Sequence, residues 1–261
     1  MQRVCGGLPK LSNDMAIRFD RVTKTYFVDS PVAGGFKNLV LHLPSQIAAM
    51  RRRRPFCALS DVSFEIATGE CVSVIGPNGA GKSTTLGLIA GVLRPSSGTI
   101  ETVGRVCPLL ELGAGFHSEL NGRENIVLNG VLLGLTREEV AERVDEIIAF
   151  SELGEFIDAP LRTYSTGMTS RLGFSVAVHL SPKILLVDEA LAVGDEAFRQ
   201  KCIRRMEHFR EQGTTMVFVS HEMESVARIS DRVALIVAGK LVDMGEPSRV
   251  IESYRSQVRA A

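Results

Sequence analysis

The chain has 261 residues, of which 45% are hydrophobic and 23% charged, the composition of an ordinary globular protein with one large domain or two small ones. Lysine plus arginine and aspartate plus glutamate each total 30, so no net charge attracts the whole chain to nucleic acid or to a membrane surface. The five cysteines are scattered, with no CxxC pair, which argues against a disulfide framework or a zinc site and indicates a reducing compartment.

The N-terminal segment MQRVCGGLPKLSND has no apolar core of the kind that a signal peptide needs. Recognisable strand sequence begins only after it, so we expect residues 1–14 to form a disordered extension and regard Met15 as an alternative start. The apolar runs elsewhere are shorter than the roughly 20 residues of a membrane span. These features predict a cytosolic protein, or one that is peripheral to a membrane.

Residues 16–28, AIRFDRVTKTYFV, predict a strand, a turn and a second strand. The pattern then breaks over an insert at 29–55, which contains an amphipathic piece and the basic block formed by Arg51, Arg52, Arg53 and Arg54. That block has two interpretations that we weigh evenly. It contacts a partner or lipid headgroups, or it is a solvated loop, as charge runs usually are.

The rest of the chain predicts apolar strands that alternate with helices. We expect two strands around a turn at Thr68–Gly69, a helix over 82–93, a mainly helical section over 115–180, strands over 184–187 and 214–221 with a helix over 201–212 between them, a hairpin that turns at Gly239, and a short helix over 248–259. This alternation indicates an α/β protein with a mostly parallel sheet that helices cover on both faces.

The segment GPNGAGKST matches the pattern GxxxxGK[ST] between a predicted strand and a predicted helix. Its glycines let the backbone wrap around phosphates, so that successive N–H groups and the helix N-terminus face the anion. Lys82 supplies a positive charge to the outer phosphates, and Ser83 offers its hydroxyl to Mg²⁺. A plain glycine-rich turn is the weaker interpretation. The predicted phosphate-binding residues are Gly76, Pro77, Asn78, Gly79, Ala80, Gly81, Lys82, Ser83 and Thr84.

Two strand ends carry polar residues that belong beside this loop. Asp188 and Glu189 follow the apolar run ILLV, where Asp188 is predicted to act as a magnesium ligand and Glu189 to position and deprotonate a water. His221 follows the run MVFVS and is predicted to hydrogen-bond the γ-phosphate and the catalytic carboxylate. A strand that simply ends in polar residues, or a structural histidine, would explain either feature taken alone.

The segment YSTGM, residues 164–168, places small polar residues directly before a run with helical apolar spacing. Such residues cap a helix and leave its positive end open to an anion. We expect that anion to be a triphosphate, which need not be held by the same subunit.

In their order along the chain, these motifs resemble those of the ATP-binding subunits of ABC transporters, over about residues 16–246. The family signature is usually written LSGGQ. Here Ser165 and Gly167 match it, whereas Tyr164, Thr166 and Met168 depart from it. YSTGM followed by RLGFSVA, with LLELGAGFHSELNGRENI upstream and EALAVGD downstream, is similar to the branch that exports O-antigen, capsule and teichoic acid.

The resemblance implies a P-loop NTPase of ABC ATPase type, with a RecA-like parallel sheet core, an antiparallel β subdomain and a helical subdomain. It implies one nucleotide-binding domain over 15–260, with the helical subdomain at about 113–181. Because the chain stops soon after Arg255, we expect no C-terminal carbohydrate-binding domain.

The resemblance also implies further site residues. Tyr26 would stack on adenine, and Asp195 would lie in the D-loop at a dimer interface. No glutamine stands at the Q-loop, where Glu111 is the nearest polar residue and a candidate metal ligand. Ser165 and Gly167 would contact the γ-phosphate held by the opposite subunit of a head-to-tail homodimer.

The function that follows from the resemblance is ATP hydrolysis, with Mg²⁺, that drives export of a lipid-linked polysaccharide, O-antigen or capsule, through integral membrane permease subunits. The chain would sit peripherally on the cytoplasmic face of the inner membrane. One alternative is a soluble ABC ATPase that acts on nucleic acid or ribosomes, which the single cassette and absent basic charge disfavour. A P-loop kinase or switch is another, but it has no place for YSTGM.

Overall fold

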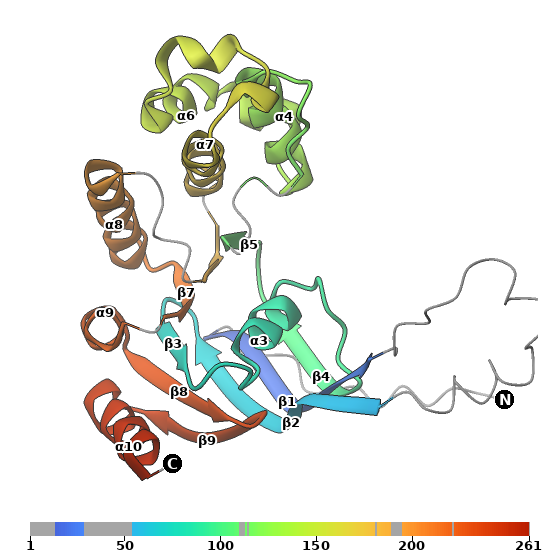
Figure 1. Cartoon of the computed structure of the whole chain (residues 1–261), viewed down its shortest axis with the longest axis vertical. Coiled ribbons are helices and arrows are strands. Elements are labelled where there is room, and N and C mark those ends of the chain that lie inside the picture. Colours follow the sequence, from blue (N-terminus) through green and yellow to red (C-terminus); the bar gives the residue numbers. More distant parts are fainter. Residues whose placement is uncertain are drawn as a thin grey trace, which may run out of the picture.

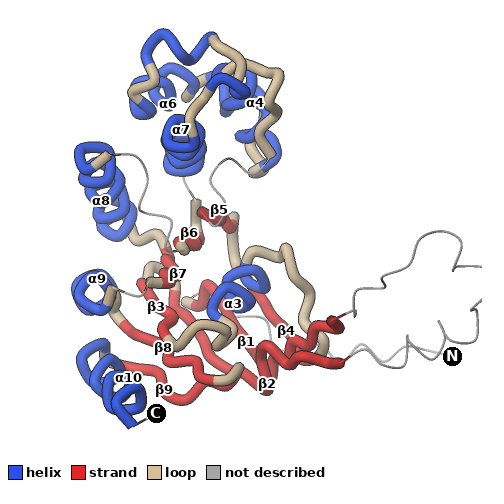
Figure 2. The backbone as a smooth tube through the Cα atoms, in the orientation of Figure 1, coloured by secondary structure: helices blue, strands red, loops and turns tan. Residues whose placement is uncertain are grey.

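The computed structural model describes residues 14–28, 54–109, 113, 115–180, 182–188, 195–220 and 222–260. Two sheets organise these residues (Figures 1 and 2). The smaller one is antiparallel, with the order β2-β1-β4, and consists of β1 (Met15–Val28), β2 (Arg54–Ala67) and β4 (Ser97–Thr102). The larger one has six strands in the order β5-β6-β7-β3-β8-β9.

The strand β1 corrects one prediction, because residues 16–28 form one strand and not two strands around a turn. A bulge explains the break in alternation: Arg21 has φ 48°, and the register with β2 shifts between Phe19 and Val22. The Arg21 amide donates to Ser63 Oγ at 2.8 Å, so the bulge leaves that donor paired. The insert predicted over 29–55 ends earlier than expected, because β2 already begins at Arg54. Residues 29–53, with Arg51, Arg52 and Arg53, lie outside the described residues.

The larger sheet is mostly parallel, as predicted. The strands are β3 (Cys71–Ile75), β5 (Val106–Leu109), β6 (Ile184–Val187), β7 (Thr215–Val219), β8 (Arg232–Val237) and β9 (Lys240–Gly245). β3 lies between β7 and β8 and is parallel to both, and only β9 runs antiparallel to its neighbour. Every residue of β3, β6 and β7 is buried, which fits strands covered on both faces. The predicted hairpin turn is confirmed, with Gly239 at φ 75°.

Most of the helices fall into two regions (Figure 1). The helices are α3 (Lys82–Ile89), α4 (Gly122–Leu132), α5 (Arg137–Ala141), α6 (Val144–Ser151), α7 (Thr166–Val178), α8 (Glu196–Glu211), α9 (Met223–Ile229) and α10 (Pro247–Ala260). α4 and α6 gather with α7 at one end of the molecule, whereas α8, α9 and α10 line one side of the larger sheet. The helix predicted over 82–93 ends at Ile89. No helix in the described ranges is both long and apolar enough to cross a bilayer.

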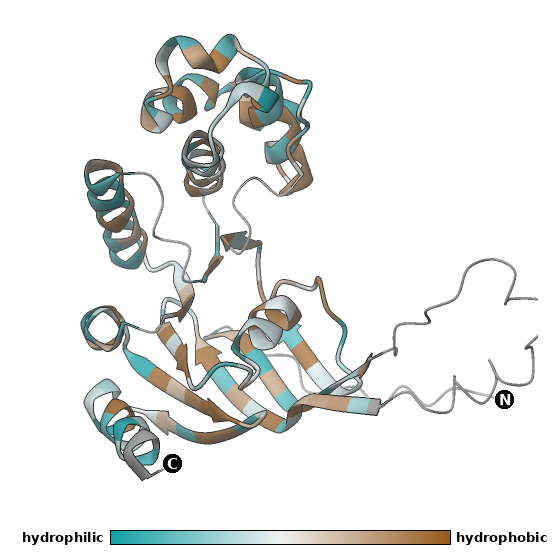
Figure 3. Cartoon of the chain, viewed as in Figure 1, coloured by the Kyte–Doolittle hydropathy of each residue, from teal (hydrophilic) through white to brown (hydrophobic). Residues whose placement is uncertain are grey.

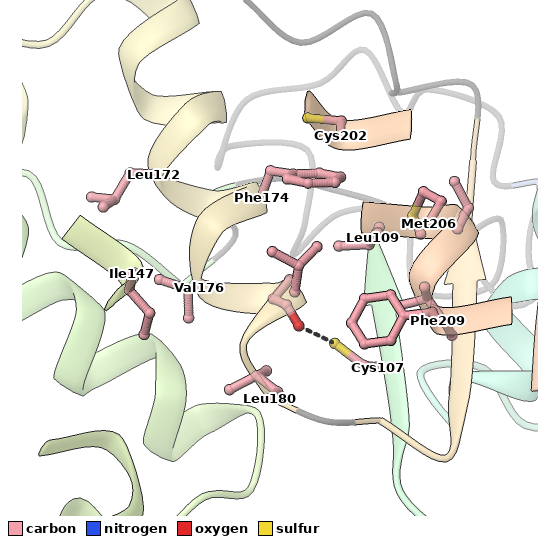
Figure 4. Close-up of a cluster of buried hydrophobic side chains, with 14 of the residues drawn as sticks. Cys107, Leu109, Ile147, Leu172, Phe174, Val176, Leu180, Cys202, Met206 and Phe209 are labelled. Atoms are coloured by element: carbon pink, nitrogen blue, oxygen red, sulfur yellow. Dashed lines mark hydrogen bonds between the residues drawn. The ribbon is translucent and has the colours of Figure 1, made fainter. Parts of the chain in front are cut away.

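The core divides between the two faces of the larger sheet because successive side chains of a strand point to opposite faces. Met216 and Phe218 of β7 pack in the cluster that includes α4, α6, α7 and α8 (Figure 4), whereas Val217 and Val219 pack with α3 and the smaller sheet. In Figure 3, brown hydrophobic residues recur along the strands of both sheets. The cysteines in this part of the chain are free thiols, namely Cys57, Cys71, Cys107 and Cys202.

Phe174 of α7 lies at the centre of the first cluster and is 0% exposed. Its ring lies 6.2 Å from the rings of Phe150 on α6 and Phe198 on α8, so it joins three helices. We predict that Phe174→Ala lowers the free energy of unfolding by about 3–5 kcal/mol, because it removes buried surface and leaves a cavity. Urea denaturation measures the change. Phe156→Ala, at a side chain 58% exposed, is the control and is expected to have little effect. Similar losses for both variants would contradict this account of the core.

Candidate functional site

The loop GPNGAGKST joins β3, the third strand from one edge of the larger sheet, to α3, and so lies at the carboxyl edge of the parallel strands, where α/β proteins bind ligands. Gly76 has φ 148° and Gly81 has φ 109°, conformations that other residues rarely adopt. A Cβ atom on Gly76 would collide with the carbonyl oxygen of Ile236, and one on Gly81 would lie 2.5 Å from the carbonyl oxygen of Ala58. Both glycines are therefore required by the packing of the loop between the two sheets.

The tip of the loop is different. Pro77, Asn78 and Gly79 are exposed. Gly79 has φ 76°, and in the described part of the chain no atom lies within 4 Å of the position that its Cβ would take. The loop is thus fixed at its base and open at its tip, which leaves its backbone N–H groups accessible to a ligand.

The N-terminus of α3 continues this open surface. Gly81 is the N-cap residue in a left-handed conformation, and no described side chain caps the first turn. The amides of that turn are therefore available to an anion, which the helix dipole also favours. Ser83 is exposed in the same turn, where its hydroxyl can serve as an oxygen ligand.

Lys82 reaches back across the loop. Its ammonium donates to the carbonyl oxygens of Gly76 at 2.9 Å and Pro77 at 3.0 Å, and the residue is buried. Burial lowers the pKa of this ammonium, and the negative charge of Asp188 acts in the opposite direction. An anionic ligand on the loop would also favour the charged form of Lys82. The structure thus holds a cation where a polyphosphate would arrive.

Asp188 is the residue directly after β6, which is joined to β3 through β7. Because β6, β7 and β3 are parallel, Asp188 at the carboxyl end of β6 lies on the same edge of the sheet as the loop, and its negative charge acts on Lys82. A carboxylate and the hydroxyl of Ser83 are hard oxygen donors of the type that Mg²⁺ takes from proteins. The described residues hold no cluster of three or more His, Cys, Asp or Glu that suits a metal ion, so the fit of Mg²⁺ rests on these two groups. Glu189, His221 and Glu111 lie outside the described residues.

YSTGM caps α7, as predicted. Ser165 is the N-cap residue, and its Oγ accepts a hydrogen bond from the Met168 amide at 3.2 Å. Tyr164 anchors the segment by donating to the carbonyl oxygen of Phe156 at 2.7 Å. Ser165 and Thr166 are exposed, so the positive end of α7 faces outward. α7 packs in a different core cluster from α3, which separates this open end from the phosphate loop of the same chain.

Asp195 caps α8 and ties it to α7. Its carboxylate accepts from the Phe198 amide at 3.0 Å and pairs with Arg171 of α7 at 2.7 Å. The backbone hydrogen bond from Phe198, followed by the charge and hydrogen bond of Arg171, lowers the pKa of Asp195. The Arg171 guanidinium also lies 4.8 Å from the centroid of the Phe198 ring. Sequence reasoning missed Arg171, since nothing local in the sequence links it to a residue 24 positions away.

Tyr26 lies on β1, opposite Phe56 on β2, and is half-buried. The ammonium of Lys24 lies 5.1 Å from the centroid of its ring. The ring thus belongs to the smaller sheet and not to the larger sheet that carries the loop.

The loop at the end of a buried parallel strand, the uncapped helix behind it, the buried lysine and the acid on the same edge define a P-loop nucleotide-binding protein. The comparison with known families narrows this class. The model of the ABC transporter family matches residues 59–192, and the chain belongs to that family.

Individual relatives and solved structures agree with this placement. The chain is 52% identical over 239 residues to the O-antigen export system ATP-binding protein RfbB of Klebsiella pneumoniae, which covers 92% of this chain and 97% of that protein. It is 40% identical over 246 residues to the teichoic acids export ATP-binding protein TagH of Enterococcus faecalis, which covers 94% of this chain and 54% of that protein. The structure of an ATP-binding subunit of an ABC transporter matches with a TM-score of 0.71 at 21% identity, covering 92% of this chain and 93% of that one. This likeness confirms the predicted ABC ATPase fold.

The contrast between Gly81, which is packed, and Gly79, which is open, predicts different effects on the stability of the fold. Gly81→Ala adds both an unfavourable φ and a collision with Ala58, whereas Gly79→Ala adds only the unfavourable φ. We therefore predict that Gly81→Ala lowers the free energy of unfolding of the nucleotide-free protein clearly more than Gly79→Ala, which costs about 1–2 kcal/mol. Urea denaturation of both variants, beside the parent chain, measures this difference. Equal losses would mean that the contact between the loop and β2 does not constrain Gly81.

Proposed function

We propose that this chain is the ATP-binding and ATP-hydrolysing subunit of an ABC transporter that exports a lipid-linked polysaccharide, an O-antigen or capsule. The observation that carries this proposal is the 52% identity to an O-antigen export ATP-binding protein over 97% of that protein's length. The geometry of the phosphate loop supports the ATP-binding part of the proposal independently. The described residues around Lys82 and α3 have the accessible amides and the cation that a triphosphate needs.

Within the proposed site, each residue has a separate task. The loop from Gly76 to Thr84 binds the phosphates, with Lys82 in contact with the outer ones. Ser83 and Asp188 hold Mg²⁺, with Glu111 as a further candidate ligand, and the ion when bound neutralises charge on the phosphate oxygens. Glu189 follows Asp188 directly in the sequence and positions and deprotonates the attacking water.

The remaining residues complete the site around the substrate. His221, which follows β7, hydrogen-bonds the γ-phosphate and the Glu189 carboxylate. Tyr26 stacks on the adenine. Asp195 holds the start of α8 at the interface with a second subunit, and its pairing with Arg171 links that interface to α7.

The open end of α7 supports a head-to-tail homodimer. Gly167 lies in the first turn of α7, and among the described atoms only Ser165 Oγ, at 3.8 Å, lies near the position of a Cβ there. Glycine in a helix costs about 0.5–1 kcal/mol relative to alanine, and the packing of this chain does not require it. In the proposed dimer, Ser165 and Gly167 approach the γ-phosphate held by the second copy. The ATP-binding cassette MJ0796, a structural neighbour with a TM-score of 0.68 at 23% identity that covers 88% of this chain and 98% of that one, forms a dimer bound to ADP and Pi.

The other proposed partner is the integral membrane permease of the export system. The chain would bind it from the cytoplasmic face of the inner membrane as a peripheral subunit. The basic block Arg51 to Arg54 would contact lipid headgroups there, because clusters of cationic side chains are attracted to anionic lipids. ATP-driven closure of the dimer would move the permease, and hydrolysis would reset it.

A pull-down tests the transporter assignment. We predict that tagged Glu189→Gln protein, incubated with Mg-ATP and detergent-solubilised membranes, recovers a multi-span membrane protein in stoichiometric amount, because the variant binds ATP without turnover. Mass spectrometry identifies the partner. Lys82→Ala is the matched control and is expected to lose the ATP-dependent part of the recovery. Recovery of ribosomal or soluble proteins alone would overturn the proposal in favour of an ATPase that acts on nucleic acid.

Gly167 offers a test of the dimer. In the Glu189→Gln background, Gly167→Ala is predicted to raise the free energy of unfolding by about 0.5–1 kcal/mol, because alanine favours the helix. The same change is predicted to weaken the ATP-dependent dimer, because the added methyl group occupies the surface that the second copy's ATP approaches. Light scattering with Mg-ATP measures the dimer. A more stable chain that still dimerises equally well would show that this surface is not the interface.

A further inference from the structure

Phe56 is an aromatic side chain on β2 that is 51% exposed. It lies directly opposite Tyr26 of β1. Directly opposed residues of an antiparallel pair project to the same face of the sheet, so the two rings are neighbours on one face. A single exposed apolar side chain is ordinary, and its meaning depends on which face of the sheet carries it.

Lys24 identifies that face. Its ammonium lies over the Tyr26 ring and donates to the carbonyl oxygen of Arg94 at 2.8 Å, in the loop that follows α3. Leu59 of β2 lies opposite Lys24, and its Cδ2 atom is 2.7 Å from the position of a Cβ on Gly81. Lys24 and Tyr26 are two residues apart on β1 and share a face, and Phe56 shares it as the direct partner of Tyr26, since the register shift between Lys24 and Thr25 takes up the extra residue of β2. Tyr26 and Phe56 therefore lie on the face of the smaller sheet that carries the phosphate loop and α3.

The position of Phe56 along β2 gives its distance from the phosphate loop. Tyr26 lies two residues from Lys24 on β1, whereas Phe56 precedes Leu59 by three on β2, because the register shifts between Lys24 and Thr25. The two pairs are therefore roughly 7 Å apart along the sheet. Leu59 touches the loop where the phosphates would bind, so Phe56 lies about that far from them along the sheet. A ligand with its phosphates on the loop and a flat base at its other end would bring the base to the exposed ring.

The rings of Tyr26 and Phe56 are not equally accessible to a ligand. Tyr26 is half-buried, and Lys24 occupies one side of it, whereas the Phe56 ring is exposed over half its surface. Bases stack on aromatic side chains whatever their identity, because every base has a π-face. We propose that Phe56 is a base-contacting residue of this site and supplies stacking surface for the purine of ATP beyond that of Tyr26. This inference rests on the proposed function, since it takes ATP as the ligand.

Phe27 provides a control that the chain itself offers. It is 63% exposed and follows Tyr26 on the same strand, so it projects from the opposite face of the sheet. It matches Phe56 in residue type, exposure and location at the same end of the β1–β2 pair. Only its face differs, which is the feature that the inference depends on.

The test compares Mg-ATP with inorganic tripolyphosphate by isothermal titration calorimetry on the full chain. We predict that Phe56→Ala weakens ATP binding about 5- to 150-fold, the range that corresponds to the loss of one base–aromatic stack. Phe56→Tyr keeps the affinity, because it keeps the ring. Phe27→Ala leaves ATP binding unchanged. Tripolyphosphate has no base, so its affinity is the same for Phe56→Ala and the parent chain.

The outcomes separate this inference from the proposed function. If the parent chain binds ATP and Phe56→Ala binds it equally well, the inference is wrong and the proposed function stands. An equal loss for Phe27→Ala, or a matching loss of tripolyphosphate binding in Phe56→Ala, would mean that the sheet or loop was disturbed, and would also overturn the inference. Failure of the parent chain to bind either ligand would instead remove the proposed function.

Discussion

The close backbone packing of the phosphate loop between the two sheets is the constraint on which the rest of the site depends. Gly81 lies against the Ala58 carbonyl of β2 and Gly76 against the Ile236 carbonyl of β8. The amide of Gly239 donates to the carbonyl oxygen of Ala80 at 3.0 Å, and the carbonyl oxygen of Gly239 accepts from the Ser60 amide at 2.8 Å. Backbone hydrogen bonds thus join the hairpin turn to both the loop and the smaller sheet. Because of this packing, the aromatic face of β1 and β2 stands at a fixed distance from the phosphate cradle.

The electrostatics of the cradle are organised before a ligand arrives. Lys82 is held by two carbonyl oxygens, which are neutral partners that an anion can outcompete. The first turn of α3 has no side-chain cap among the described residues, so its amides are not committed elsewhere. Preorganised donors of this kind cost little reorganisation when charge arrives or develops near them. Asp188 adds the opposite charge on the same edge, where a cation can lie between the acid and the phosphates.

Features specified within a few residues could be predicted from the sequence. The phosphate loop, the cap at Ser165, the turn at Gly239 and the buried strand before Asp188 all have local signals, and the structure has each of these elements. Features that depend on distant partners could not be predicted this way. The bulge at Arg21 is completed by Ser63 of another strand, and the Arg171–Asp195 pair joins helices that meet only in the folded chain. The strands β4 and β5 were also missed, since β4 is largely exposed and β5 has only four residues.

The glycines of the site are of two kinds: some are required by packing within this chain, and one is not. Gly76 and Gly81 are explained within the chain, because a larger residue would collide with a backbone carbonyl. Gly167 is not explained in that way, since its φ is not positive and the described chain leaves space around it. A helix that tolerates an unfavourable residue in its first exposed turn needs a reason outside its own packing. In the proposed dimer, a phosphate that approaches the open amides of α7 from another subunit would supply that reason. Arg171 of α7 pairs with Asp195, the N-cap residue of α8. A movement of the exposed end of α7 would therefore act on Asp195 through this ion pair.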